Sequence, residues 1–218
     1  MDVYDHTILE LRNTCSTDFC KDVIDRFEKD SRKHRGLTAD GVKLDVKVST
    51  DLAFRRDDYK FGDICDKICK DIFGLGLVKY MKRISKIDRS RETGSRGCIS
   101  ELIIDRVHIT CPVIQRTDEG GFFDWHTDYS PGQNRILGGI LYLNDVNEED
   151  GGSTEFNSGR KIQPEAGKII IFPSDLTHLH RGNVLKHGSK YIATVFFHIP
   201  SPSRTNPSPF IPPFIYSR

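Results

Sequence analysis

The segment Trp125-His126-Thr127-Asp128 is the first part of this chain whose residue types and spacing could do chemistry. In a strand, side chains two positions apart point to the same face, so His126 and Asp128 would present an imidazole and a carboxylate to one point. Two histidines and one carboxylate on one face of a metal, with the other positions open, are typical of non-haem iron(II) oxygenases. Alone the pair is weak evidence, because a histidine satisfied by an acid at a strand edge has the same pattern.

A second histidine must then come from a later strand that folds back beside the first. Two candidates, His178 and His180, lie in the segment Leu176–Gly182. They are two positions apart, so both would point to one face of an extended chain. The residue pattern alone leaves the choice between them open.

Lys190 follows His180 by ten residues and begins the apolar run YIATVFF. An ammonium group inside a β-core needs an anionic partner, because the burial of an unpaired charge is costly. The distal carboxylate of 2-oxoglutarate would be such a partner. The alternative is a lysine at a strand entrance with its ammonium group in water, which is common.

Short β-rich runs separated by turn residues make up the chain from residue 99 onward. The runs are ISELIIDRVHI, GGFFDWH, ILGGILYLN, GGSTEF, GKIIIFP and KYIATVFFHI. Regular short strands with turn signals favour an antiparallel sandwich or barrel. These strands would bring the candidate ligands together.

The first 98 residues predict mainly helices. Ser16-Thr17-Asp18 offers an N-cap, the apolar residues of 19–27 recur at helical spacing, and Gly36 is a plausible stop. A second helix is expected from Tyr59 to about Met81, interrupted near Gly74 and Gly76. Between the helices, alternation in VKLDVKV (42–48) predicts a strand.

The bulk composition is that of a soluble globular protein of 218 residues, with 37% hydrophobic and 29% charged residues and a net charge of +1. The length suits one domain. The balanced charge gives no reason to expect nucleic acid or a membrane as partner. The sequence has neither a basic, apolar signal segment at its start nor an apolar run long enough to cross a bilayer, so we expect a cytoplasmic protein.

Three features have a structural and a functional interpretation. The six cysteines form no disulfide framework; Cys65 and Cys69, one helical turn apart, could share a metal, but packing on a helix face is favoured. The charged segment 82–97 is interpreted as a solvated loop, with a substrate-contacting flap as the alternative. The tail 201–218 is proline-rich and is expected to be extended, either packed along the body or mobile, with resemblance to substrate or self-modification as the alternative.

The stretch from about Ile109 to Phe197 resembles the catalytic domain of the prolyl 4-hydroxylase-like 2-oxoglutarate/Fe(II) dioxygenases. The matching pieces, in order, are GGFFDWHTD, RILGGILYLND, GGSTEF, AGKIIIFPSDLTHLHRG and GSKYIATVFF. The resemblance implies an α+β, mainly β fold with a double-stranded β-helix (jelly-roll) core. It implies one domain, with a helical support region at 1–98, the core at 99–200 and the tail at 201–218.

The resemblance also implies roles for individual residues. His126, Asp128 and His180 match the family's iron ligands, since its 2-oxoglutarate-binding basic residue follows the distal histidine by nine or ten positions, as Lys190 follows His180. Four further residues match family positions that contact either the cosubstrate or a peptide. Lys190, Tyr142 and Thr154 match residues near the distal carboxylate of 2-oxoglutarate, and Arg135 matches an arginine that contacts peptide.

The expected activity is hydroxylation with Fe(II), 2-oxoglutarate and O2, with ascorbate as a reductant. The substrate implied by the resemblance is a protein or peptide side chain, proline first. One departure affects this: prolyl 4-hydroxylases carry a tyrosine nine residues before the first iron-binding histidine, where this chain has Thr117. Alternatives are a hydroxylase of a free amino acid or other small molecule, an oxidative demethylase of nucleic acid, and a metal- or ligand-binding β-barrel without catalysis. The last would have no reason to keep Lys190 facing inward.

Overall fold

Two β-sheets face each other and form the body of the protein. The computed structural model describes residues 6–86, 106–129 and 132–200. The larger sheet has the strand order β1-β11-β8-β13-β6-β4-β2, with β5 paired to β13, and the smaller has the order β10-β9-β12-β7-β3. All the pairings are antiparallel. The prediction of a mainly β chain with few helices is confirmed.

The larger sheet consists of β1 (Leu9–Leu11), β2 (His34–Arg35), β4 (Thr50–Ala53), β5 (His108–Ile109), β6 (Val113–Asp118), β8 (Arg135–Tyr142), β11 (Ile169–Pro173) and β13 (Ser189–His198). The smaller consists of β3 (Lys47–Val48), β7 (Phe122–His126), β9 (Thr154–Phe156), β10 (Lys161–Ile162) and β12 (His180–Gly182). Short 3-10 turns, Glu148–Asp150 and Leu176–His178, lie in the connections. The central strands β8, β11 and β13 are the apolar runs of the sequence, since they are covered on both faces.

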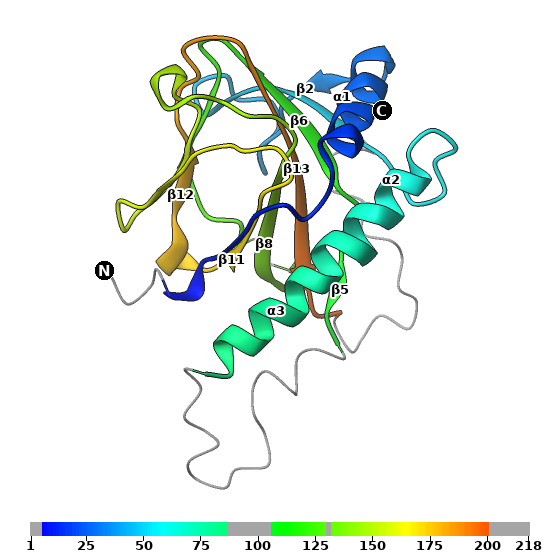
Figure 1. Cartoon of the computed structure of the whole chain (residues 1–218). Coiled ribbons are helices and arrows are strands. Elements are labelled where there is room, and N and C mark those ends of the chain that lie inside the picture. The colour runs from blue at the N-terminus through cyan, green and yellow to red at the C-terminus, as the bar shows by residue number, and fades with distance from the viewer. Residues whose placement is uncertain (1–5, 87–105, 130–131, 201–218) are drawn as a thin grey trace, which may run out of the picture.

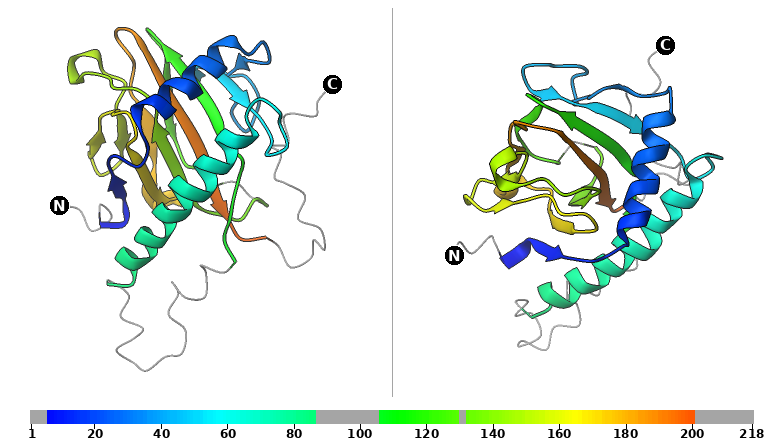
Figure 2. Two further views of the ribbon diagram at one scale, coloured as in Figure 1. Left: turned by 45° about the vertical axis from the view of Figure 1, so that its right-hand side comes forward. Right: turned by 45° about the horizontal axis from the view of Figure 1, so that its top comes forward.

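Two helical segments cross the outer face of the larger sheet (Figures 1 and 2). Helix α1 (Thr17–Lys29) begins where the Ser16 side chain accepts a hydrogen bond from the Phe19 amide, as predicted. The second segment runs without a break through α2 (Gly62–Asp66), the π-helix η2 (Lys67–Gly74) and α3 (Leu75–Ile84). Both bury an apolar face in one core shared with the sheet, and this core includes Cys65 and Cys69.

Glycine does not interrupt the second helix, contrary to the prediction. A Cβ on Gly76 would lie 2.8 Å from the Ile169 side chain and 3.0 Å from that of Ile171. The glycine therefore lets the helix approach β11 closely, and the packing against the sheet offsets its low helix propensity. Among the described residues, no helix is long and apolar enough to span a bilayer.

Other predicted boundaries are wrong for local reasons. The first helix ends at Lys29 with Asp30 as its C-cap, well before Gly36. The Asp30 carboxylate accepts hydrogen bonds from the backbone and side-chain N–H groups of Arg32. Of the predicted strand 42–48, only the last two residues form a strand. The carbonyl of Lys43 accepts the amides of Val46 and Lys47 in a turn instead.

Most of the strands predicted after residue 99 are present, while β6, β10 and β12 lie outside the predicted runs. The run ISELIIDRVHI contributes only β5, and its first seven residues lie outside the described part of the chain. Most of the charged segment 82–97, Cys98 and the tail 201–218 also lie outside it, so the interpretations of these segments stay predictions.

Candidate iron and 2-oxoglutarate site

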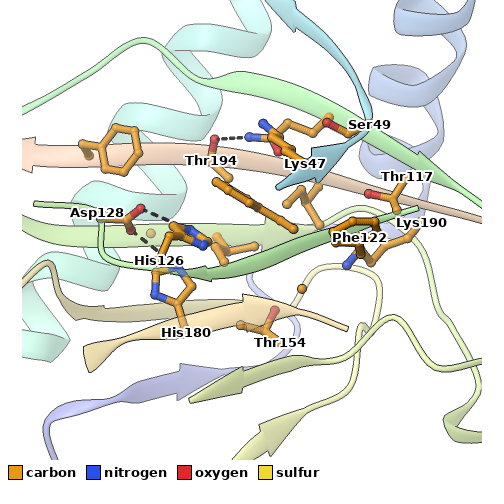
Figure 3. Close-up of a pocket in the computed structure, with 17 residues that line it drawn as sticks. Lys47, Ser49, Thr117, Phe122, His126, Asp128, Thr154, His180, Lys190 and Thr194 are labelled. Carbon is orange, nitrogen blue, oxygen red and sulfur yellow. Dashed lines mark hydrogen bonds and ion pairs between the residues drawn. The ribbon is translucent and has the colours of Figure 1, made fainter. Parts of the chain in front are cut away.

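His126, Asp128 and His180 come together at one end of the space between the two sheets (Figure 3). His126 ends β7 and His180 begins β12, and the two are direct partners in the smaller sheet. Ligand atoms from the three residues all lie within 4.8 Å of one another. The Nε2 atoms of His126 and His180 lie 3.8 and 3.9 Å from the Asp128 carboxylate oxygens, one on each oxygen. This geometry suits a single cation among two nitrogens and one carboxylate.

Backbone carbonyls fix the orientation of both imidazoles. The Nδ1 atom of His126 lies 2.8 Å from the carbonyl oxygen of Asp124, and that of His180 lies 3.1 Å from the carbonyl oxygen of His178. A carbonyl oxygen only accepts, so each ring carries its proton on Nδ1. Each Nε2 is then left with a lone pair, as a metal ligand requires.

Aromatic rings enclose the two histidines. Phe123 stacks on His126 with ring centroids 3.6 Å apart and an interplanar angle of 13°, and Phe172 meets His180 edge-on at 4.7 Å. Burial, reinforced by the neighbouring His180, lowers the pKa of His126 well below its ordinary value. Both effects favour the neutral imidazole that binds a metal ion.

Space for the Asp128 carboxylate depends on a glycine. A Cβ built on Gly138 of β8 would lie 2.4 Å from Asp128 Oδ2 and 3.0 Å from two ring atoms of Phe172. The carboxylate thus occupies a position that any side chain on residue 138 would fill. The donor set, the free Nε2 atoms and this space fit the ferrous ion of a non-haem oxygenase.

His178, the other candidate from the sequence, lies outside the cluster. It belongs to the turn before β12, where its ring contacts the Thr7 hydroxyl at 2.7 Å and the Asp175 carboxylate at 3.0 Å. Its side chain is buried by these contacts. The structure therefore brings His180, and not His178, beside His126 and Asp128.

Lys190 lines the same pocket as the three clustered residues. Its side chain is buried, with 5% of the residue exposed, and Nζ donates to the carbonyl oxygen of Gly152 at 2.8 Å. Burial lowers the pKa of Lys190 to about 8. No carboxylate pairs with this ammonium group among the described residues, so the pocket has a buried cation that an anionic ligand would compensate.

Tyr142 and Thr154 form a hydrogen-bonded pair next to this cation. The fully buried Tyr142 hydroxyl donates to Thr154 Oγ1 at 2.7 Å, and burial raises the pKa of Tyr142. Thr154 lines the pocket, whereas Tyr142 is not among the lining residues. Thr154 is thus in position to contact a ligand, and Tyr142 orients its hydroxyl from behind.

Arg135 and Thr117 lie at different parts of the site. Arg135 donates to the Asp128 carbonyl oxygen at 3.2 Å and stacks at 3.7 Å on the ring of Phe196, a lining residue. Burial lowers the pKa of Arg135 to about 10. Thr117, which replaces the tyrosine of prolyl 4-hydroxylases, pairs with Lys190 across β6 and β13 and lines the pocket.

Several pocket residues were not singled out in the sequence, above all Lys47, which forms a buried ion pair with Asp51, and the neighbouring Gln115. The available signal was Lys47 at the end of the apolar-polar alternation 42–48, with Asp51 four positions later. That pattern is common on exposed strands, so only the fold shows that the pair is buried.

Comparison with known proteins agrees with this geometry. The sequence profile of the 2OG-Fe(II) oxygenase superfamily matches residues 112–198, which hold all three clustered residues and Lys190. A search of curated protein sequences gave no significant match.

Among solved structures, a prolyl hydroxylase from Trichoplax adhaerens, in complex with a hypoxia inducible factor peptide fragment, is similar at a TM-score of 0.68 and 15% identity, covering 89% of this chain and 84% of that one. A prolyl-4-hydroxylase from Pseudomonas putida gives a TM-score of 0.62 at 12% identity, with coverage of 90% and 94%. A viral collagen prolyl hydroxylase from Paramecium Bursaria Chlorella virus-1 gives 0.57 at 19%, with coverage of 92% and 100%.

At these identities the solved structures show the fold alone, and the superfamily profile covers residues 112–198, which is less than half of the chain. An oxygenase of this superfamily uses Fe(II) and 2-oxoglutarate together with O2. The profile match over residues 112–198 and the cluster of His126, Asp128 and His180 indicate a 2-oxoglutarate- and Fe(II)-dependent dioxygenase, in a chain with the fold of the prolyl hydroxylases.

Proposed function

We propose that this dioxygenase hydroxylates a side chain within a protein or peptide, proline first, with Fe(II) held by His126, Asp128 and His180. The observation that carries the proposal is the arrangement of these three residues in one pocket with the buried, unpaired cation of Lys190. A metal-binding barrel without catalysis would have no use for that cation, which costs free energy unless an anion compensates it.

Each residue has a defined task in this proposal. Bound Fe(II) supplies O2 activation coupled to decarboxylation of 2-oxoglutarate, which yields succinate, CO2 and a hydroxylated product. Lys190 binds the distal carboxylate of 2-oxoglutarate through a charge-assisted hydrogen bond and so fixes its orientation. Thr154, held by Tyr142, offers a hydroxyl group to the same carboxylate. Phe123 and Phe172 exclude water around the histidines.

A peptide substrate is supported by the fold and by the position of Arg135. The Trichoplax adhaerens enzyme, whose fold this chain shares, binds a peptide fragment. Arg135 lies beside Asp128 and against Phe196, at the metal end of the pocket, where the substrate must approach. We therefore keep Arg135 as a substrate-binding residue.

The domain division is also part of the proposal. We infer one oxygenase domain, in which the helices before residue 98 support the jelly-roll core of residues 99–200. Packing of both helical segments and the larger sheet in one apolar core supports this division. Ascorbate as a reductant stays a prediction from the family resemblance.

Anaerobic titration tests the cofactor assignment. Fe(II) and then 2-oxoglutarate are added to the parent, to His180→Ala and to His178→Ala, and the visible charge-transfer band of the chelated keto acid is recorded. We expect the band in the parent and in His178→Ala, and its loss in His180→Ala. A folded parent without the band would contradict the proposal. A band that survives in His180→Ala and is lost in His178→Ala would move the ligand to His178.

A further inference from the structure

Lys47, Ser49 and Gln115 line one side wall of the pocket, and Lys47 forms a buried ion pair with Asp51 behind that wall, at the corner where the chain passes from the smaller to the larger sheet. Lys47 ends up in β3 beside Phe123, and Asp51 in β4 beside Gln115. Lys47 Nζ donates to Asp51 Oδ2 at 2.7 Å, and the side chains are only 4% and 5% exposed. The Ser49 hydroxyl donates to the other Asp51 oxygen at 2.7 Å. This wall is polar and carries no net charge.

The Lys47 ammonium group keeps hydrogen-bonding capacity for a ligand. Of its three N–H groups, one is used by Asp51, and Nζ lies 5.0 Å from the ring centroid of Phe123. No other acceptor contacts Nζ within the part of the chain that the structure describes. Because Lys47 lines the pocket, a ligand in the pocket can accept hydrogen bonds from its remaining N–H groups.

Gln115, on the strand beside Asp51, supplies the complementary acceptor. The Thr194 hydroxyl donates to the Val113 carbonyl oxygen at 3.4 Å, so its oxygen accepts from Gln115 Nε2 at 3.0 Å. This fixes the amide orientation and leaves Gln115 Oε1 without a partner among the described residues. Figure 3 shows Lys47, Ser49 and Thr194 along one side of the pocket, apart from Lys190.

A donor and an acceptor on a neutral wall match a peptide bond. The peptide carbonyl oxygen accepts from an ammonium group, and the peptide N–H donates to an amide oxygen. The positive charge of Lys47 is already balanced by Asp51. A free carboxylate would therefore bury a second negative charge without a partner, which is costly. The wall therefore discriminates between a residue inside a peptide and a free amino acid.

We propose that Lys47 and Gln115 bind a backbone amide of the primary substrate, so that the enzyme acts on residues within peptides rather than on free amino acids. The inference rests on the proposed function, because it assumes that Lys190 and the three clustered residues hold 2-oxoglutarate and iron. Its failure is distinguishable from a failure of that function, since the charge-transfer band reports the cofactor site alone.

The test compares kinetics of the parent with Lys47→Met. Substrates are capped peptides with one proline each, and free L-proline. We expect turnover of capped peptide but not of L-proline by the parent. In Lys47→Met, we expect kcat/KM for the best peptide to fall roughly 10- to 100-fold, as for loss of a charge-assisted hydrogen bond, with the KM for 2-oxoglutarate within about twofold of the parent.

Two further variants separate recognition from folding. Lys47→Met alone leaves Asp51 buried and unpaired, so Lys47→Met/Asp51→Asn restores a neutral wall and is expected to fold and still bind peptide weakly. Lys43→Met removes the matched lysine of the exposed pair with Asp40 in the same segment, and parental kinetics are expected.

Three outcomes would overturn the proposal. The first is parental kcat/KM for the peptide in the folded double variant. The second is a rise in the KM for 2-oxoglutarate in place of the peptide effect, which would move Lys47 to the cosubstrate site. The third is turnover of L-proline in preference to every capped peptide, together with an intact charge-transfer band.

Discussion

Substitution of Gly138 by alanine should weaken iron binding without removing a ligand. The new Cβ would lie 2.4 Å from Asp128 Oδ2, whereas ordinary contact begins at 3.4 Å, so the carboxylate must move by about 1 Å. The new methyl group cannot retreat, because the Phe172 ring lies 3.0 Å away. Metal–ligand distances tolerate only about 0.2 Å.

We therefore expect the Kd for Fe(II) to rise about 10- to 100-fold, as for loss of an orienting contact, which is about 1.4 to 2.7 kcal/mol. The assay is an anaerobic Fe(II) titration at saturating 2-oxoglutarate, read at the charge-transfer band. Thermal unfolding of the metal-free protein is measured alongside, to show that the variant is folded.

The neighbouring Gly139 provides the matched control because its Cβ would point to the other face of the sheet. There it would lie 2.7 Å from Phe73 and 2.9 Å from Val195, in the helix–sheet core. Gly139→Ala should cost about 1 to 3 kcal/mol of stability through overpacking, while the folded fraction keeps the parental iron affinity. Parental iron affinity in Gly138→Ala would refute the reasoning.

Three other predictions follow from buried groups. Affinity for 2-oxoglutarate should be constant below pH 8 and fall above it, because Lys190, with its pKa lowered to about 8, carries its charge only below that pH; a Kd that stays constant to pH 9.5 in calorimetric titrations would exclude this role. Thr154→Val should cost about 1 to 3 kcal/mol in denaturant unfolding, since the buried Tyr142 hydroxyl loses its acceptor, and an unchanged stability would mean that another group replaces it. Fe(II) at 100 times its Kd should stabilise the parent by about 2.7 kcal/mol but leave the unfolding midpoint of His180→Ala unchanged, and equal stabilisation of both would place the ion elsewhere.

The candidate ligands could be predicted from the sequence because each depends on a local rule. His126 and Asp128 share a face through strand alternation, and the spacing between His180 and Lys190 matches the family. The apolar run that follows Lys190 left two alternatives open, a buried ammonium group or one in water, and the structure shows the buried one. What the sequence could not supply is which side chains meet across the pocket.

Strand β6 shows the physical reason why one strand was not predicted. A strand is recognised by an apolar face, but here Gln115 and Thr117 face a polar pocket and Arg116 faces the Glu28 carboxylate of α1. Polar residues on both faces hide the alternation. Similarly, the need for Gly138 depends on a carboxylate from another segment. The Lys47–Asp51 pair depends on a corner between the two sheets, and the predicted strand 42–48 ends before Asp51.

Glu28 has a consequence for how the pocket is held. Its carboxylate accepts from Arg116 on β6 at 2.9 Å and from the Tyr191 hydroxyl on β13 at 2.9 Å. These two residues are the outward neighbours of Thr117 and Lys190, so one anion on α1 clamps the two strands that form the cosubstrate end. The metal end has its own support in Gly138 and Phe172. The two ends of the cavity are thus supported independently. A change that displaces α1 would weaken binding of 2-oxoglutarate, as we propose it binds, and would leave the affinity for Fe(II) unchanged.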